Sequence, residues 1–338
     1  MNINELKVTI VIPAYNAEKT IGLALSAALA QGCPVCDVLV VDDGSTDGTA
    51  EAVKRYPHAR YVRQKNAGPA AARNTGWKNS DSEFVIFTDS DCVPEPGWAK
   101  RLMEGFTGEA VGAATGSYDI ANADSLLPRL IHEEIKDRHV FYKDEVKFFG
   151  SYNVAVRRSV LAETGGFDEG YRRASGEDND LSYRVLKAGY TIRFVPGALV
   201  AHHHTERLIK YLKEQYTHGF WRMKLYRAHP DMAGGDDYTK LKDVAEPPLS
   251  LLNLALMFLL PLSCLARGFV WPWMTGVAGW GFAATLAVLL LMQVPAAVRI
   301  ALRHKDAGYL ALAPVTFLRG YARGLGLLFG FVRFNLKG

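Results

Sequence analysis

The chain has 338 residues and is 49% hydrophobic, which is enough for about two domains with sizeable cores. A formal net charge of +4 is too small to indicate nucleic acid as a partner. Four cysteines in so long a chain are too few for a disulfide framework and are typical of a reduced compartment.

The first 90 residues contain three short apolar runs that are typical of buried strands. The β-branched run at 8–12 is typical of a strand buried on both faces, and the apolar runs at 38–41 and 84–88 each end in acidic residues. Helical patterns lie between these runs, at about 18–30, 47–56 and 68–79. This alternation predicts a mostly parallel, doubly wound α/β sheet. Ligands of such sheets bind beyond the carboxyl ends of the strands, so we expect a site at the polar residues there: Asn16, Asp43, Asp89 and Asp91.

The pattern changes after about residue 110. A further strand is expected at 111–118 and a charged helix at 125–142, and the segments that follow are rich in glycine, acids and aromatics. We interpret this half as the side that binds a second substrate. Residues 205–228 predict an amphipathic helix and residues 229–246 a linker. The apolar side chains of that helix recur on overlapping turns: Leu208, Ile209, Leu212, Tyr216, Phe220 and Met223.

Two long uncharged stretches come next. Residues 247–266 and 268–298 hold no charged side chain, and about 20 apolar residues in a helix cross the hydrocarbon core of a membrane. We therefore predict transmembrane spans at about 247–266 and 271–295. A pair of buried helices in a soluble domain is the alternative.

The last apolar stretch, at about 308–332, is interrupted by Arg319 and Arg323. These arginines are four residues apart and share one helix face. We interpret the stretch as a helix in the membrane interface with its arginines toward phosphate headgroups, or as a third span that buries both charges.

Positive residues predict the orientation of the two spans. Only Arg267 lies between them, whereas three positive residues follow the second span: Arg299, Arg303 and Lys305. Because positive loops stay in the cytoplasm, we expect an integral protein of the cytoplasmic membrane whose first 246 residues are cytoplasmic.

A pair of acids follows the strand expected at 84–88. Asp89 and Asp91 lie two residues apart on a tight turn, where both carboxylates can address one divalent cation such as Mg²⁺. A solvated turn is the alternative, since aspartate is common in turns.

Two other segments contain side chains that could bind a nucleotide or act as a general base. In "VDDGSTD" one carboxylate can accept a hydrogen bond from a nucleotide base while the other caps the next helix, and the ring in "PAYN" at 13–16 suits stacking on that base. "GEDND" places Glu177, Asp178 and Asp180 at the start of a helical pattern. These acids either stabilise the helix N-terminus or supply a general base that takes a proton from a sugar hydroxyl.

In their order along the chain, these motifs resemble the family 2 glycosyltransferases of the GT-A fold. The resemblance covers about residues 7–204 and implies a Rossmann-like, nucleotide-sugar-binding catalytic domain, here residues 1–228 with a donor half at 1–110 and an acceptor half at 111–204. A C-terminal α-helical membrane region at 247–338 would follow it. The matching segments are "TIVIPAYNAEKTI" at 9–21, "VLVVDDGSTDGT" at 38–49, "NAGPAAARNTG" at 66–76, "FTDSDC" at 87–92, "GSYNVAVRR" at 150–158, "GGFDE" at 165–169 and "GEDNDLSYRVLKAGY" at 176–190.

The resemblance also implies residue roles. Asp178 matches the catalytic base, and Asp91 with Asp89 matches the acidic pair that holds Mn²⁺ or Mg²⁺. The resemblance further implies that three residues lie on the side of the site that binds the acceptor: Glu177, Phe167 and Asp168. The residues implied for the donor are Pro13, Tyr15, Asn16, Asp43, Arg73, Asp89, Ser90, Gly150 and Asn153.

Three adjacent histidines end a further apolar run. Several metal-dependent GT-A enzymes take another metal ligand from a histidine about six residues after a proline, and Pro196 precedes His202 by six. Because side chains alternate along a strand, His202 and His204 can share a face while His203 points away. We expect His202 as a ligand and His204 as a further candidate; the alternative is that they cap the strand or contact the donor diphosphate.

The resemblance predicts an inverting, metal-dependent enzyme that moves a sugar from a nucleotide sugar, with UDP favoured by Asp43, to a hydroxyl of a lipid-linked saccharide. After Gln215 the Arg-Trp pair of processive synthases is missing, which indicates addition of one or a few sugars. One alternative is a polyprenyl-phosphate glycosyl transferase, whose ionised acceptor needs no base. Another is a non-catalytic, membrane-bound nucleotide-sugar sensor.

Overall fold

A computed structural model describes residues 6–32, 36–140, 142–237, 239–265 and 272–336 of the chain. The chain divides into two compact units at His204, residues 1–204 and 205–338. The predicted catalytic domain includes the helix at 205–228, whereas in the structure this helix belongs to the second unit. Arg267, which supported the predicted orientation, lies outside the described residues.

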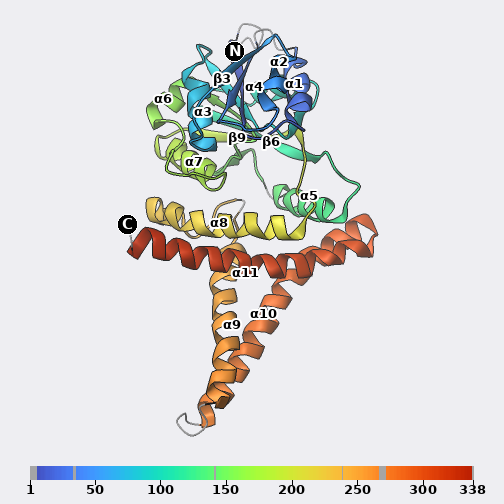
Figure 1. Ribbon diagram of the computed structural model, residues 1–338, viewed down its shortest axis with the longest axis vertical. Coiled ribbons are helices and arrows are strands. Elements are labelled where there is room, and N and C mark those ends of the chain that lie inside the picture. The colour runs from blue at the N-terminus through green and yellow to red at the C-terminus, as the bar shows by residue number, and fades with distance from the viewer. Residues whose placement is uncertain (1–5, 33–35, 141, 238, 266–271, 337–338) are drawn as a thin grey trace. The chain divides into compact units, whose positions relative to one another are not determined.

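The first unit is built on one nine-stranded sheet with the order β3-β2-β1-β4-β8-β6-β9-β5, and β7 pairs with β9 (Figure 1). The first four strands are parallel, whereas β8 runs antiparallel to both of its neighbours. The strands predicted at 8–12, 38–41 and 84–88 are confirmed as β1, β2 and β4. The strands are β1 (Val8–Ala14), β2 (Cys36–Asp42), β3 (Ala59–Arg63), β4 (Phe84–Thr88), β5 (Cys92–Pro94), β6 (Val111–Ile120), β7 (Glu145–Val146), β8 (Asn153–Arg157) and β9 (Thr191–His202).

Helices cover both faces of this sheet, so the doubly wound α/β arrangement is confirmed. Ile10 and Ile12 of β1 pack in one core with side chains of α1 and α4, and Val11 packs in the other core with side chains of α3 and α7. This division follows from the period of two along a strand. The helices are α1 (Ile21–Leu29), α2 (Thr49–Lys54), α3 (Pro69–Lys78), α4 (Trp98–Glu104), α5 (Leu126–His139), α6 (Arg158–Thr164) and α7 (Glu177–Lys187).

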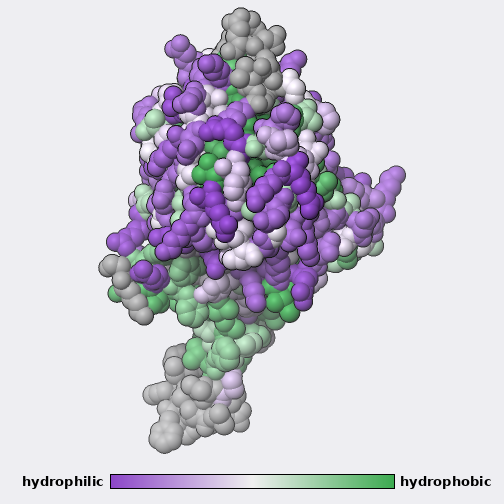
Figure 2. Space-filling view, turned by 45° about the horizontal axis from the view of Figure 1, so that its top comes forward, coloured by the Kyte–Doolittle hydropathy of each residue, from purple (hydrophilic) through white to green (hydrophobic). Residues whose placement is uncertain are grey.

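The second unit is helical. Two of its described helices, over Leu241–Pro261 and Thr275–His304, are long and apolar enough to cross a membrane. The helix over Leu241–Pro261 begins inside residues 229–246, the predicted linker, so the segment before this helix is shorter than predicted. The visible face of this unit is largely hydrophobic, whereas that of the first unit is largely hydrophilic (Figure 2). The helices are α8 (Leu208–Ala228), α9 (Leu241–Leu265), α10 (Pro272–His304) and α11 (Leu312–Phe331), with short 3₁₀-helices at Pro230–Met232 and Ala307–Ala311 and a π-helical segment at Val332–Leu336.

Helices α8 and α11 lie side by side (Figure 1) and approach closely through glycines. A Cβ added to Gly326 would lie 2.0 Å from the carbonyl oxygen of Tyr216, and one added to Gly219 would lie 2.1 Å from that of Arg323. The predicted apolar face of α8 is confirmed in part. Phe220 and Met223 lie against Gly330 of α11, whereas Ile209 is 71% exposed, and the most buried residues of α8 are Tyr211, Gln215, Gly219 and Leu225. Close backbone contact needs small residues at the interface, which a pattern of large apolar side chains does not reveal.

The arginines of α11 face the interior of the second unit. Arg319 is 2% exposed, with Nη2 at 3.9 Å from Oε2 of the buried Glu246 of α9. Arg323 donates from Nε to Oε1 of Gln215 at 2.8 Å. Arg319 therefore does not point toward headgroups as expected, because it is buried beside Glu246. That the helix lies in the membrane interface stays a prediction.

Candidate active site

The carboxyl ends of β1, β2 and β4 meet at one edge of the sheet and open onto a pocket of about 570 Å³. Most of the residues predicted to bind a donor or metal line this pocket: Pro13, Tyr15, Asp43, Arg73, Asp89, Ser90 and Asp91. Tyr15 is 53% exposed, so its ring is available to a ligand. The pocket is completed by Ala14, Asn66, Gly68, Pro69, Ala72, Arg172, Arg173 and Ala174.

Asp43 fixes the rim of the pocket. Its Oδ1 accepts hydrogen bonds from Nε2 of Gln64 at 2.7 Å and from the backbone N–H of Ala67 at 2.9 Å, and its Oδ2 accepts from the N–H of Gly68 at 2.8 Å. Gly68 has a φ of 99°, which an L side chain rarely adopts, and it begins α3. The carboxylate thus positions the loop that carries Asn66 and Gly68 into the pocket.

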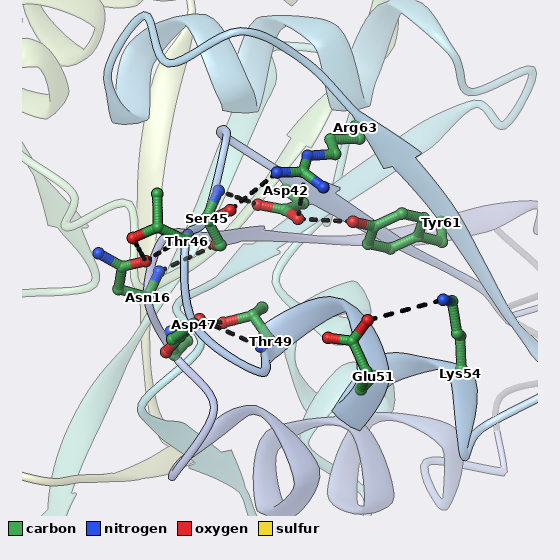
Figure 3. Close-up of polar contacts among 11 residues, drawn as sticks. Asn16, Asp42, Ser45, Thr46, Asp47, Thr49, Glu51, Lys54, Tyr61 and Arg63 are labelled. Atoms are coloured by element: carbon green, nitrogen blue, oxygen red, sulfur yellow. Dashed lines mark hydrogen bonds and ion pairs between the residues drawn. The ribbon is translucent and has the colours of Figure 1, made fainter.

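The neighbouring Asp42 has a structural role (Figure 3). It accepts hydrogen bonds from the backbone N–H of Ser45 at 2.7 Å and from the hydroxyl of Tyr61 at 2.5 Å. Burial opposes ionisation, but these hydrogen bonds prevail and lower the pKa of Asp42 below its usual value. Asp42 therefore stays ionised and shapes the turn after β2.

Asn16 belongs to the same turn rather than to the lining of the pocket. Its Oδ1 accepts from the N–H of Thr46 at 2.8 Å, and its own N–H donates to Oγ of Ser45 at 3.0 Å (Figure 3). Its φ of 50° is one that asparagine tolerates better than most residues. The side chain predicted to bind the donor thus ties together the loops that follow β1 and β2.

Arg73 connects the two acidic motifs. It is 2% exposed and donates from Nη2 to Oδ1 of Asp89 at 2.7 Å and from Nη1 to Oε1 of Glu177 at 2.9 Å. Both acids keep the pKa of the guanidinium high against the effect of burial. Arg73 thereby fixes the distance between the end of β4 and the start of α7.

Glu177 and Asp178 differ in their surroundings. Glu177 is 2% exposed and accepts a second hydrogen bond, from the N–H of Ser175 at 2.7 Å. Burial and the neighbouring Asp178 raise the pKa of Glu177 to about 7, although Arg73 opposes the shift. Asp178 is half-buried, and its Oδ1 accepts from the N–H of Asn179 at 2.9 Å. It acts electrostatically on both Arg73 and Glu177 but, among the described residues, is not part of the pocket lining.

A candidate metal centre lies where β5 pairs with β9. The register places His202 opposite Cys92, and one possible ligand atom each from Asp91, Cys92 and His202 lies within 4.8 Å of the others. Nε2 of His202 is 3.8 Å from Oδ2 of Asp91. Burial and Asp91 raise the pKa of the Cys92 thiol well above its usual value, so this group is neutral. Oxygen and imidazole ligands suit Mn²⁺ or Mg²⁺, whereas a thiol does not.

The other two histidines of the triplet diverge as expected from strand alternation. His203 is exposed and His204 is buried. Burial, together with His202 and His132, lowers the pKa of His204 to about 2, so this imidazole is neutral. The sequence prediction that His202 and His204 share a face agrees with a distance of 3.2 Å between their Nδ1 atoms.

Four other residues predicted for the site lie away from the pocket. Asn153 is fully buried in the sheet. Its side-chain oxygen accepts a hydrogen bond from the indole N–H of Trp98, and its side-chain nitrogen donates to the carbonyl oxygens of Ser117 and Ala198. The structure thus corrects the prediction that Asn153 contacts a donor sugar, because a side chain inside the sheet is inaccessible. Gly150 is buried beside Tyr152, Phe167 packs edge-on against Phe87 in the core, and Asp168 accepts from the N–H of Gly170 in a turn.

Arg172 and Arg173 are pocket residues that the sequence analysis did not assign. Both are exposed and line the pocket from the loop that precedes α7. Their signal in the sequence is a pair of adjacent arginines five and four residues before Glu177. Arginine side chains at a pocket can hold an anionic ligand such as a diphosphate.

Comparisons with known proteins agree with this fold and site. The family described as Glycosyl transferase family 2 matches residues 9–165. A pre-mycofactocin glycosyltransferase of Mycobacterium tuberculosis is 33% identical over 242 residues, which cover 66% of this chain and 48% of that protein. A probable glycosyltransferase of Bacillus subtilis, YdaM, is 31% identical over 264 residues, which cover 72% of this chain and 59% of that protein. The chain thus spans only about half the length of these relatives.

A solved structure shares the fold. The mannosyltransferase PcManGT from Pyrobaculum calidifontis, in complex with GDP-Man and Mn²⁺, matches 93% of this chain and 87% of its own with a TM-score of 0.53. At 20% identity this likeness concerns the fold alone. Together with the family match and the curated relatives, it confirms the GT-A fold expected from the sequence. This chain belongs to glycosyl transferase family 2.

Proposed function

We propose that this protein is an inverting, metal-dependent glycosyltransferase that moves a sugar from a nucleotide sugar to a hydroxyl group. The observation that carries the proposal is the pocket at the ends of β1, β2 and β4, where an exposed aromatic ring, three aspartates and three arginines line one space. Tyr15 would stack on the base, and Arg172 and Arg173 would hold the diphosphate.

Asp91 and His202 are the residues that would hold a divalent cation. Oδ2 of Asp91 and Nε2 of His202 lie 3.8 Å apart, so a carboxylate oxygen and an imidazole nitrogen are close enough to share one cation. A bound cation would neutralise the charge that develops on the leaving diphosphate. Asp89, which is held by Arg73, would orient the donor beside it.

Asp178 is the proposed base. It would take the proton of the acceptor hydroxyl as that oxygen bonds to the anomeric carbon, while the bond from that carbon to the diphosphate oxygen breaks on the opposite side. Attack from the side opposite the leaving group inverts the anomeric configuration. Glu177 would stay beside Arg73 and keep the start of α7 in place.

We further propose that the acceptor is lipid-linked and that the donor is a UDP sugar. The two apolar helices over Leu241–Pro261 and Thr275–His304 support a membrane location. The positive residues Arg299, Arg303 and Lys305 at the end of the second helix favour placing the first unit on the cytoplasmic side. A protein that stays in membranes after washing at alkaline pH would agree with this location, and complete release into the wash would contradict it.

The test of the activity uses the full chain in detergent. Candidate donors with UDP, GDP and dTDP are incubated with Mn²⁺ or Mg²⁺, and release of the nucleoside diphosphate is measured with and without lipid extracts. We expect metal-dependent release from one donor, and its loss in Asp91→Asn. Tight donor binding without turnover in any lipid extract would indicate a sensor instead. Turnover with polyprenyl phosphate that survives Asp178→Asn would indicate a phosphate acceptor.

A further inference from the structure

His202 is connected to a second, buried imidazole. Nδ1 of His202 lies 3.2 Å from Nδ1 of His204, and the two ring centres are 4.6 Å apart. His204 is 4% exposed and lies on the side of His202 that faces away from Asp91, since Nε2 of His202 is the atom directed at Asp91. The two nitrogens of His202 thus face different partners.

The hydrogen bond between the imidazoles has two possible directions with different consequences. If His204 donates, Nδ1 of His202 is the acceptor and its proton must lie on Nε2, which then has no lone pair for a cation. If His202 donates, its proton is on Nδ1 and its Nε2 lone pair is free. Only the second arrangement allows His202 to act as a metal ligand beside Asp91.

The backbone of His204 is held independently of its ring. The side chain of Asn122 donates from Nδ2 to the carbonyl oxygen of His204 at 2.8 Å and accepts at Oδ1 from its N–H at 3.0 Å. This pair of hydrogen bonds fixes the chain just beyond the end of β9. The ring then occupies a closed space beside His132, whose ring centre is 5.9 Å away.

His204 is poorly suited to be a ligand itself. Its Nδ1 is engaged by His202, and its Nε2 is buried without a hydrogen-bond partner among the described residues. The compact group of possible ligand atoms comprises Asp91, Cys92 and His202 and does not include His204. A ring that is held in place by its backbone and hydrogen-bonds the proposed ligand matches the outer partners that orient metal-bound histidines.

We propose that His204 is a positioning residue for the metal centre: its Nδ1 accepts the Nδ1 proton of His202 and so keeps the Nε2 lone pair of His202 directed at Asp91. The inference rests on the metal site of the proposed function and assigns His204 a role other than that of a ligand. The loss of such a partner lowers metal affinity by about 10- to 100-fold.

The test compares two substitutions that differ in one property. His204→Asn keeps an acceptor oxygen at the δ position, whereas His204→Leu fills a similar volume without one. The affinity for Mn²⁺ alone is measured on the full chain in detergent, from the electron paramagnetic resonance signal of free Mn²⁺. We expect His204→Leu to bind about 10- to 100-fold more weakly and His204→Asn to keep most of the affinity. His203→Asn, at the exposed neighbouring position, serves as the matched control and should bind as the unmodified chain does.

Each outcome decides the proposal. Unchanged Mn²⁺ affinity in His204→Leu, with binding abolished in His202→Ala, would overturn the positioning role and leave the proposed function intact. Equal weakening in His204→Asn and His204→Leu would make His204 a ligand and also overturn it. No Mn²⁺ binding by the unmodified chain would overturn both proposals together. Melting curves verify folding, and His204→Ala replaces the leucine variant if that variant does not fold.

Discussion

Arg73 and Glu177 are 104 positions apart in the sequence, and in the structure Nη1 of the arginine donates to Oε1 of the glutamate over 2.9 Å. Arg73 comes from α3 and Glu177 from the first turn of α7. Because the other guanidinium nitrogen, Nη2, holds Asp89 at the end of β4, one side chain links the proposed donor site to the helix that carries the proposed base.

Replacing Arg73 should destabilise the protein strongly. Arg73→Met leaves the buried Glu177 without its partner, and breaking a buried ion pair costs about 3–5 kcal/mol. We expect a clear loss of unfolding free energy in denaturant titrations of the full chain, together with weaker donor binding. Arg60→Met is the matched control, because the Arg60–Asp37 pair is close, at 2.7 Å, but half-exposed. Exposed pairs contribute about 0–1 kcal/mol, so equal losses in the two variants would contradict the bridging role of Arg73.

Replacing Asp178 should remove transfer without removing the donor. Asp178→Asn keeps the size of the side chain but cannot accept a proton, and general base catalysis contributes about 10²- to 10⁴-fold. We expect kcat to fall by at least about 100-fold, while the Kd of the donor nucleotide stays unchanged. Asp180→Asn, two positions along α7, is the control, because Asp180 pairs with Arg184 at 2.6 Å. Near-normal turnover in Asp178→Asn would exclude Asp178 as the base.

His139 should make stability depend on pH. Burial, with Arg138 and His132 nearby, lowers its pKa from 6.5 to about 4, and its Nδ1 lies 2.8 Å from Oγ of Ser117. Between these two pKa values the unfolded chain binds a proton at His139 that the folded chain does not bind. The contribution of neutral His139 to the free energy of unfolding is therefore complete above pH 6.5 and is lost as the pH falls toward 4.

The measurement for His139 is the unfolding free energy at several values between pH 4 and 7. His139→Gln should reduce the slope in this window by up to about 1.4 kcal/mol per pH unit. The buried His132 and His204 also have lowered pKa values and are retained in the variant, so some slope remains. Identical slopes in the two proteins would show that His139 is protonated as readily when folded as when unfolded.

The contact between α8 and α11 should not tolerate a larger residue at Gly326. A Cβ there would lie 2.0 Å from the carbonyl oxygen of Tyr216, so Gly326→Ala must separate the helices. Overpacking of this kind costs about 1–3 kcal/mol. Gly276→Ala is the control, since a Cβ at this position of α10 meets nothing within 4 Å and alanine favours a helix by about 1 kcal/mol. A melting temperature that falls only in Gly326→Ala supports the close contact, and equal melting temperatures would contradict it.

The core of the first unit and the place of the pocket could be predicted from the amino-acid sequence. Runs of β-branched residues predict buried strands from local composition, and acids after those runs must gather where parallel strands end. Of the residues predicted at the strand ends, Asp43, Asp89 and Asp91 line one pocket, whereas Asn16 is not among the residues that line it. The predicted alternation also holds just past the end of β9, where His203 is exposed and His204 is buried.

Which polar side chains hold the fold together and which are available to a ligand depends on contacts between distant segments, and these are seen only in the folded chain. Asn153 is matched to a motif by sequence, but its amide is used up by Trp98, Ser117 and Ala198, which lie 36 to 55 positions away. Likewise, the sequence predicts that Arg319 faces membrane headgroups, whereas in the structure Arg319 lies beside the buried Glu246 of α9. A local pattern contains the chemistry of a side chain but not the identity of its distant partner, and that partner determines whether a charge faces a ligand, a membrane or the interior.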